Sequence, residues 1–366
     1  MTIKASGTLS FKDDIEAEFG TTPARSLGQY RRDDPAFTNK SFSGSSLSNL
    51  PLDTGIPTGS FDEIKFSDFY GKSLNIVVDC FSNSGTDEFR INAKKNKWNN
   101  NKIVIINPST VSKKESGTKI IIRVNKRFGS DKIQDASTNG AGRCALRTGT
   151  WNNPASLTVD MGSSAKVLGA GGNGGDGADG IQNNAGIGRT GTSGLGIEHQ
   201  GTVINLRSGS IIRAGYGGGG GGGGGRETSK HDRRAGGGGG GGGAGFPIGN
   251  GGNRGVPTGG KKDSGGEKGK DGNPGTATVG GAGGAGGDNH DQAFGGKGGD
   301  GGQNGKAAED GDSSTTQGFD KNKENKAKEG AGGGNGAAIR KTSGISFSFG
   351  VNSGTITGSQ TATGVA

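Results

Sequence analysis

The sequence predicts an all-β N-terminal portion followed by a glycine-rich domain of packed polyglycine II helices, bracketed by short β-hairpin units. Three observations lead to this fold class. Runs of β-branched residues, bounded by Gly, Ser, Asn and Pro, lie in the first half of the chain. Residues 166–366 hold 69 of the 83 glycines. Within the glycine tracts, other side chains recur with a period of three residues, which fits neither a strand nor an α-helix.

Residues 1–72 are predicted to form a small docking module. Two short related stretches, 6–15 and 63–72, flank a polar segment with Pro35, Pro51 and Pro57, which is typical of a loop. The elements Ser6-Gly-Thr-Leu-Ser-Phe and Ile64-Lys-Phe-Ser-Asp-Phe-Tyr resemble sequences near the N-termini of tailed-phage structural proteins.

Residues 73–167 are predicted to form a compact β-rich domain, with strands at 74–81, 102–107 and 118–125. A repeated unit occurs at 157–169, 202–215 and 345–358. Each copy has an alternating strand, a Ser/Gly turn, a shorter strand and a glycine. Because the copies bracket the glycine tracts, we interpret them as β-hairpin or corner units.

Residues 168–366 are predicted to form the glycine-rich domain. In the tract 171–179, polar side chains stand at Asn173, Asp176 and Asp179. A polyproline-II-type helix has three residues per turn and no internal hydrogen bonds, so its backbone must bond to neighbouring helices. Only glycine allows such close approach. We therefore expect helices with one side chain per turn at the periphery. The pure glycine runs 217–225 and 236–243 are expected in the middle, as antiparallel neighbours joined by 226–235.

A flexible glycine linker is the alternative interpretation of this composition, because glycine in a regular element costs about 0.5–1 kcal/mol per residue relative to alanine. Several phased tracts of similar length, bracketed by β-units, favour packed helices. Collagen is not expected, because the chain has nine prolines and no long Gly-X-Y run.

Several functional classes are disfavoured by the sequence. The net charge of +9 does not indicate a nucleic-acid partner, because basic and acidic residues alternate. Cys80 and Cys144 have no metal-ligand spacing and are interpreted as small buried apolar residues. The tract 171–178 resembles one calcium-binding nonapeptide, but tandem copies are missing, so no metal is predicted. Residues 255–262 imitate a phosphate-binding loop, but Lys262 stands where Ser or Thr is needed. No cofactor and no nucleophile–base pair is predicted, so we do not expect an enzyme.

The expected location is a virion. No secretory signal follows Met1, and no run of about 18 apolar residues could insert into a membrane. A repetitive surface-type protein without an export signal fits a tail-fibre or baseplate component, assembled in the host cytoplasm and released by lysis.

The C-terminal part resembles a known family. The resemblance is carried by the segments that begin Cys144-Ala-Leu-Arg-Thr-Gly-Thr-Trp, Lys166-Val-Leu-Gly-Ala-Gly-Gly, Gly194-Leu-Gly-Ile-Glu and Ala214-Gly-Tyr-Gly-Gly. Together they resemble the adhesins at the tail-fibre tips of T-even-type bacteriophages, over roughly residues 140–366. The resemblance implies a sandwich of polyglycine-type helices whose connecting loops contact the bacterial surface.

The candidate binding site is the set of loops 226–235, 246–258, 288–294 and 313–328, where charged and aromatic residues gather between the tracts. Such residues on loops above a rigid scaffold are typical of a binding surface. The predicted receptor-binding residues are Tyr216, His231, Arg233, Arg234, Phe246, Asn250, Asn253, Arg254, His290, Phe294 and Phe319.

These observations predict a phage tail adhesin that recognises an outer-membrane protein or polysaccharide of a bacterium. Residues 1–72 are expected to join it to other tail or fibre proteins. The alternative is a structural tail, baseplate or fibre connector without direct host binding. The two hypotheses differ in one observation: a purified adhesin binds host cells, whereas a connector binds only virion parts.

Overall fold

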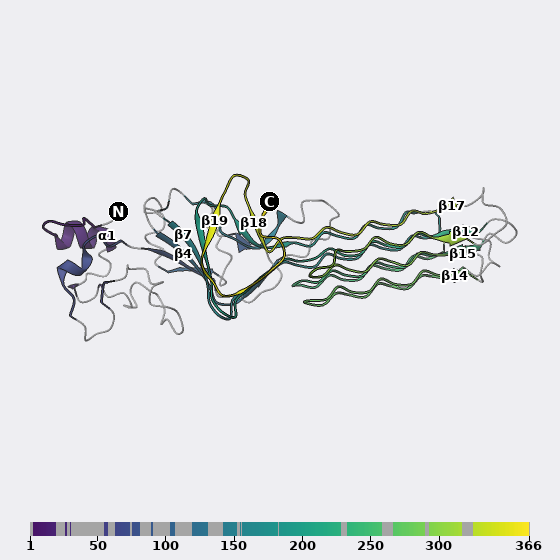
Figure 1. The fold of residues 1–366 in the computed structure, drawn as a ribbon, viewed down its shortest axis with the longest axis horizontal. Coiled ribbons are helices and arrows are strands. Elements are labelled where there is room, and N and C mark those ends of the chain that lie inside the picture. The colour runs from purple at the N-terminus through teal and green to yellow at the C-terminus, as the bar shows by residue number, and fades with distance from the viewer. Residues whose placement is uncertain are drawn as a thin grey trace.

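The protein is described by a computed structural model, and its described part is elongated (Figure 1). A small N-terminal module lies at one end, β-sheets follow, and glycine-rich extended segments run from the sheets to the opposite end. Within the described residues, no helix is long and apolar enough to cross a membrane. The described residues are 3–19, 26–27, 30, 55–57, 63–73, 75–80, 89–90, 103–106, 119–130, 142–151, 154, 156–181, 183–227, 233–257, 266–289, 293–316 and 325–365.

The N-terminal module has short helices and an apolar core of its own. A π-helix, η1 (Phe11–Glu16), leads into α1 (Ala17–Phe19), and a 3-10 helix, η4 (Phe66–Phe69), lies later in the chain. Ser10 precedes the first helix, and its Oγ accepts the N–H of Asp13 at 3.1 Å. The core residues are Ile3, Ile15, Phe19, Tyr30, Ile56 and Phe69. The role of this module in attachment stays a prediction.

Three β-sheets form the middle of the described part. Their strand orders are β19-β10-β7-β4-β1-β3, β20-β11-β8-β5 and β2-β6-β9-β18-β21. β3 is antiparallel to β1, and the other neighbours are parallel. The strands are β1 (Ile76–Cys80), β2 (Phe89–Arg90), β3 (Ile103–Ile106), β4 (Lys119–Val124), β5 (Arg127–Gly129), β6 (Cys144–Arg147), β7 (Ser156–Met161), β8 (Lys166–Leu168), β9 (Ser193–Ile197), β10 (Thr202–Leu206), β11 (Ile211–Arg213), β18 (Ile339–Lys341), β19 (Phe347–Asn352), β20 (Thr355–Thr357) and β21 (Ala362–Thr363).

The chain winds through the three sheets in successive coils. The strand triplets β4-β5-β6, β7-β8-β9, β10-β11-β18 and β19-β20-β21 each contribute one strand to every sheet. The repeated unit of the sequence is therefore a corner between two sheets, which confirms the corner alternative, whereas the β-hairpin alternative is wrong. β7 and β8 belong to one unit but bond to β10 and β11 of the next unit, because stacking equivalent units in register buries an apolar face that one unit cannot bury alone.

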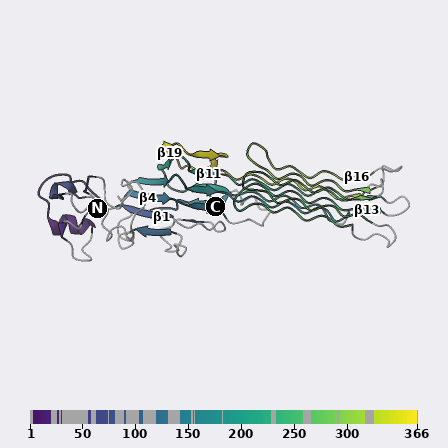
Figure 2. The ribbon, with the colours of Figure 1, turned by 90° about the horizontal axis from the view of Figure 1, so that it is seen from below.

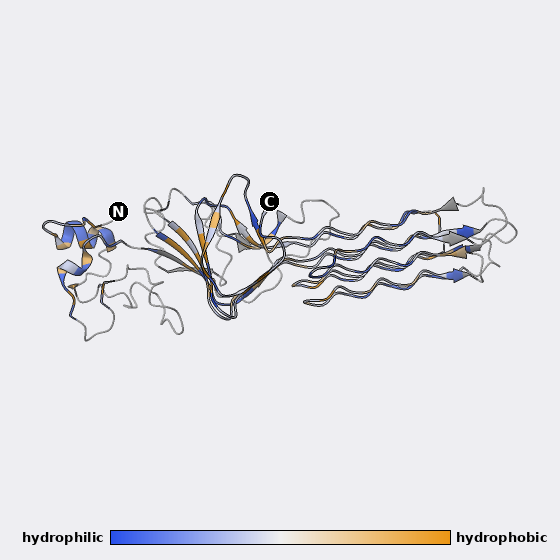
Figure 3. Ribbon diagram, in the orientation of Figure 1, coloured by the Kyte–Doolittle hydropathy of each residue, from blue (hydrophilic) through white to orange (hydrophobic). Residues whose placement is uncertain are grey.

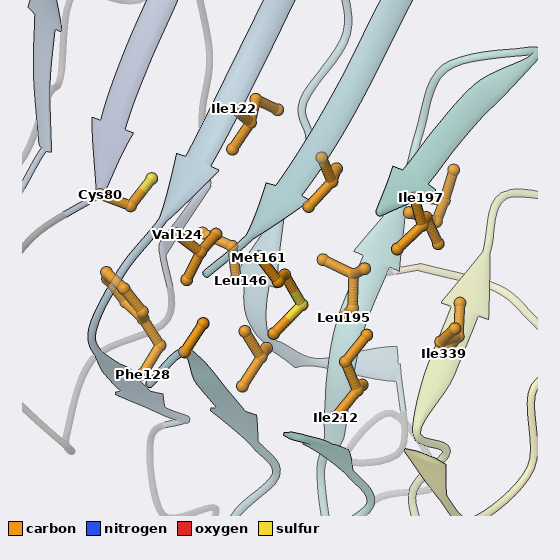
Figure 4. Close-up of a cluster of buried hydrophobic side chains, with 14 of the residues drawn as sticks. Cys80, Ile122, Val124, Phe128, Leu146, Met161, Leu195, Ile197, Ile212 and Ile339 are labelled. Carbon is orange, nitrogen blue, oxygen red and sulfur yellow. The ribbon is translucent and has the colours of Figure 1, made fainter. Parts of the chain in front are cut away.

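Stacking of the coils in register builds the core. Equivalent positions carry large apolar residues that are fully buried, and Figure 4 shows several of them converging between the sheets. The register partners are Ile122, Val159 and Ile204 in the first sheet, Phe128, Val167 and Ile212 in the second, and Leu146, Leu195 and Ile339 in the third. Cys80 and Cys144 are also fully buried and unbridged, which confirms their interpretation as small apolar residues.

Glycine-rich extended segments, here called rows, leave the sheets and run together toward one end of the molecule (Figures 1 and 2). Two rows are inserted between β8 and β9, and the others between β11 and β18. Strands from beyond residue 168 thus complete all three sheets, so the β-rich part is not confined to the predicted range 73–167. The ten rows in the described part are A (169–179), B (184–192), C (214–224), D (236–244), E (249–257), F (266–275), G (280–287), H (295–302), I (307–314) and J (327–337).

Backbone hydrogen bonds join neighbouring rows at every third residue. The N–H of Gly172 donates to the carbonyl of Tyr216 in row C at 2.8 Å. Three residues later, Gly175 donates to Gly219 of the same row at 2.9 Å. Gly174 donates instead to Asn250 in row E at 2.8 Å. Consecutive residues therefore face different neighbours, unlike the two-residue alternation of a β-strand.

Rows C and D lie in the middle of this lattice. Row C bonds to rows A, B, D, H, I and J, and row D bonds to rows A, C, E, F, G and H. A Cβ on Gly221 would lie 1.9 Å from the carbonyl oxygen of Asp176, and one on Gly240 would lie 2.1 Å from that of Gly219. The prediction that the two pure glycine runs lie in the middle as antiparallel neighbours is confirmed.

Different forces stabilise the sheets and the rows. Hydrophobic residues are concentrated on the sheet strands, whereas the rows carry few of them (Figure 3). Apolar burial therefore dominates in the sheets. In the rows, close backbone approach and many hydrogen bonds, each worth about 0.5–1.5 kcal/mol net, take its place.

Candidate functional site

The end of the rows farthest from the sheets, here called the tip, carries six short strands (Figure 1). They form two three-stranded sheets in the described part, with the orders β13-β12-β17 and β14-β15-β16. The opposite end of the rows, next to the large sheets, is called the base. The tip strands are β12 (Gly225–Glu227), β13 (Arg233–Ala235), β14 (Asp288–Asn289), β15 (Ala293–Phe294), β16 (Thr315–Thr316) and β17 (Asn325–Lys326).

Three connectors start from these tip sheets. Residues 228–232 join β12 to β13, residues 290–292 join β14 to β15, and residues 317–324 join β16 to β17. The connectors themselves lie outside the described residues. Because β16 and β17 belong to different tip sheets, the connector 317–324 links both of them. The roots of the three connectors are therefore held together.

Arginine residues lie at the roots of the connector 228–232. Arg226 is the register partner of Arg234 in β13 and of Asn325 in β17, and Arg233 stands opposite Glu227. Arg234 is only 7% exposed. Two of the predicted receptor-binding residues, Arg233 and Arg234, thus lie on a tip strand.

Four other predicted residues lie on a tip strand or fall in the connectors between tip strands. Phe294 ends β15, where its side chain is half-buried and its backbone is the register partner of Asp288. His231, His290 and Phe319 fall within the connectors and lie outside the described residues. Their involvement in binding stays a prediction.

The structure places Tyr216 and Phe246 at the base instead of the tip. Tyr216 is 5% exposed, and its hydroxyl donates to Asn304 Oδ1 at 3.4 Å. Burial raises the pKa of the Tyr216 phenol, which the charge of Arg213 partly offsets. Phe246 lies in the turn between rows D and E, and the guanidinium carbon of Arg127 stands 3.9 Å from the centroid of its ring. Both aromatic residues therefore lie at the base, against the scaffold and away from the tip, and their involvement in receptor binding stays a prediction.

Asn250, Asn253 and Arg254 lie along row E, so the predicted loop 246–258 is largely an extended row. Their side chains are exposed on the flank of the lattice. Row E fits there because Gly249, Gly252 and the later Gly255 recur every third residue and donate to row D at 2.8–3.1 Å. The three-residue spacing of these glycines could have indicated a row from the sequence, but the Asn, Arg and Val residues between them obscured the pattern.

Two further connectors were missed by the sequence reasoning. The turn around residues 180–183 joins rows A and B, and residues 258–265 join rows E and F; the second lies outside the described residues. A bridge between Ala235 and Glu267 ties the start of row F to β13 at the tip. The three-residue glycine period, which stops after Gly255 and resumes at Gly266, could have indicated this connector.

A buried ion pair joins two of the segments that carry the sequence resemblance. Arg147 in β6 donates to both carboxylate oxygens of Glu198, at 2.8 and 3.2 Å, and the N–H of Gly149 donates to the same carboxylate at 3.0 Å. The two side chains are 9% and 5% exposed. This network joins the segments around Cys144 and Gly194, so we interpret it as structural. Among the described residues, no group of three or more His, Cys, Asp or Glu side chains could hold a metal ion.

The geometry defines a β-rich protein with a head of hydrogen-bonded rows, whose connectors gather at one end. The chain belongs to the family of phage tail fibre adhesins Gp38, whose sequence model matches residues 87–361. This result confirms the resemblance inferred from the sequence and extends it toward the N-terminus. Membership also identifies the chain as a phage tail protein.

One solved structure is similar to the chain: the gp37-gp38 adhesin tip complex of the bacteriophage S16 long tail fibre. The sequence identity is 18%, the match covers 89% of this chain and 95% of that chain, and the TM-score is 0.34. No curated protein matches the chain in sequence.

Proposed function

We propose that the chain recognises the bacterial surface through its tip, as the receptor-binding protein of a phage tail fibre. The observation that carries this proposal is the gathering of the connectors 228–232, 290–292 and 317–324 on two small sheets at the end of the lattice. Variable loops held by a rigid scaffold are typical of binding sites. Membership of a tail fibre adhesin family supports the same role. The role is binding, without catalysis.

We also propose that the rows are polyglycine II helices. Two observations support this: bonds between rows recur every three residues, and each central row bonds to six neighbours. Three residues per turn is the repeat of this helix type, and only glycine permits such close packing of backbones. Such a scaffold holds the connectors in fixed relative positions.

The proposed receptor-binding residues are Arg233, Arg234 and Phe294 on the tip strands, with His231, His290 and Phe319 in the connectors. The receptor is proposed to be an outer-membrane protein or a polysaccharide. Residues 1–72 are proposed to bind another tail-fibre protein, because this module has its own core and lies at the end opposite the tip. Assembly in the host cytoplasm and release by lysis complete the proposal.

Competition between the purified chain and phage for adsorption to host cells tests the proposal. The tip variant carries Arg233→Ser, His290→Ser, Phe294→Ser and Phe319→Ser. Its matched control carries Asn250→Ser, Asn253→Ser and Arg254→Ser on the exposed flank of row E. We expect the wild type and the flank variant to compete, and the tip variant to lose competition while keeping its melting temperature. If the wild type does not compete, or if the tip variant competes equally well, the chain is a structural connector.

A further inference from the structure

Three side chains form a regular ladder along one edge of the lattice. In row A, Oδ1 of Asn173 accepts the N–H of Asn250 at 2.9 Å, and Oδ1 of Asp176 accepts the N–H of Asn253 at 2.7 Å. Oδ1 of Asp179 accepts the N–H of Val256 at 2.8 Å. All three bonds join residues 77 apart in sequence, so the ladder follows the two rows without a change of register.

The ladder satisfies N–H groups that the backbone lattice leaves without a carbonyl. The N–H groups of row E at 250, 253 and 256 point to row A, where side-chain oxygens accept them. In the centre of the lattice, a carbonyl of a neighbouring row would accept such a bond. Here a short Asn or Asp side chain supplies the oxygen, while the backbone of row A donates to row E at Gly174 and Gly177. Rows A and E thus exchange one bond per triplet in each direction.

The same arrangement recurs between rows H and G, which shows that it depends on the type of side chain. Oδ1 of Asp300 accepts the N–H of Gly283 at 3.0 Å, and Oε1 of Gln303 accepts the N–H of Gly280 at 3.2 Å. Lys297 occupies the next triplet position, and its ammonium group can only donate. Its Nζ bonds to Asp300 at 3.2 Å instead. The third residue of a glycine triplet therefore acts as a cap only where it carries an oxygen acceptor.

We infer that Asn173, Asp176 and Asp179 are positioning residues that hold rows A and E in one register. Glycine rows have no side chains that interlock, so hydrogen bonds alone fix how far one row is displaced along another. Only every third N–H of row E faces the ladder, so a slip of one residue breaks it. Rows A and E both run to the tip, so the ladder fixes how far the tip end of one row lies beyond that of the other. This inference rests on the proposed function of the tip.

The test compares two variants of the full-length chain. One carries Asn173→Ala, Asp176→Ala and Asp179→Ala, which removes the three acceptors. Its control carries Asp176→Asn and Asp179→Asn, which removes the same two charges but keeps every acceptor oxygen. Amide hydrogen exchange is measured residue by residue in row E, and adsorption to host cells is measured with virions that carry each variant.

In the alanine variant, we expect exchange at Asn250, Asn253 and Val256 to accelerate by about fivefold or more, as the loss of one hydrogen bond predicts. Exchange at Gly249, Gly252 and Gly255 stays unchanged, because these N–H groups donate to row D. Adsorption falls in the alanine variant and is normal in the asparagine variant.

Unchanged exchange at the three ladder amides overturns the inference, whatever the adsorption result. Faster exchange at all six amides shows general loosening and also overturns it, as does faster ladder exchange with normal adsorption. The proposed function fails by a separate criterion, which is normal competition by the tip variant. The two failures are therefore distinguishable.

Discussion

Replacing Gly221 with alanine is predicted to destabilise the lattice from its centre. A Cβ at this position would lie 1.9 Å from the carbonyl oxygen of Asp176 and 2.6 Å from its carbonyl carbon. Ordinary contact of carbon with its neighbours needs about 3.5 Å, so rows A and C must separate by about 1.5 Å. The bonds that Gly175 and Ala178 of row A donate to row C are 2.9 and 3.0 Å long, and such a separation breaks them.

The magnitude follows from these two effects. Overpacking in a dense interior costs about 1–3 kcal/mol, and two lost hydrogen bonds add about 1 kcal/mol each, so the free energy of unfolding falls by about 3–5 kcal/mol. For a unit of this size, each kcal/mol lowers the melting temperature by about 2–4 °C, which gives a decrease on the order of 10 °C.

Gly334→Ala is the matched control, because the chemical change is the same and the site is open. The atom nearest to a Cβ there is Thr190 Cγ2 at 3.7 Å, an ordinary contact. This substitution is expected to be neutral or to stabilise by up to about 1 kcal/mol through lower entropy of the unfolded chain. Both variants are measured by thermal unfolding with the wild type. Equal melting temperatures for the two alanine variants would refute the assignment of row C to the centre.

Three further predictions concern the scaffold. Glu198→Ala leaves the buried Arg147 without its carboxylate and is expected to lower the free energy of unfolding by about 3–5 kcal/mol, measured by chemical denaturation. The double variant Arg147→Met with Glu198→Leu is expected to recover most of this loss, and an equal loss in the single and the double variant would contradict the prediction. Burial opposes ionisation of Asp300, but a backbone N–H and a neighbouring lysine outweigh it and lower its pKa below 3.8. The ionised Asp300 carboxylate therefore stabilises the fold above pH 3.8, and this stabilisation disappears as the pH falls through the lower pKa of the folded state. The melting temperatures of the wild type and of Asp300→Asn should converge in strong acid. A difference in melting temperature that stays constant down to about pH 2 would contradict this. Phe246→Ala is expected to lower stability by about 0.5–2 kcal/mol without weakening adsorption, and a double-mutant cycle with Arg127→Ala checks that their contact is the cause.

The central rows could be predicted from the sequence because the pattern of glycines in a tract indicates on how many sides other rows pack against it. An uninterrupted glycine run has no side chain to place outward, so it fits only where neighbours lie on every side. Tracts with a polar residue at every third position, such as Asn173 and Asp176, have one outward face. The three-residue period therefore indicates whether a row lies in the centre of the lattice or at its edge.

The corners and the base turn could not be predicted in the same way, because their partners are distant in sequence. A strand, a Ser/Gly turn and a second strand look alike whether the strands bond to each other or to other coils. One of the two partners of β7 is β10, which lies beyond two glycine rows. Phe246 shows the same limit: an aromatic residue beside a proline suggests an exposed loop, and only the fold reveals Arg127 against its ring.

The way in which the rows are rooted has a mechanical consequence. Rows A, B, C and J continue directly into β8, β9, β11 and β18, and the rows run along the long axis of the molecule. A pull on the tip along that axis loads the bonds between rows in shear, so many must break together before any row slides. The four covalent roots distribute the same tension over two adjacent sheets. A head built in this way resists axial traction while a virion is held by its fibre, yet a sideways force at an edge row can peel that row away one bond at a time.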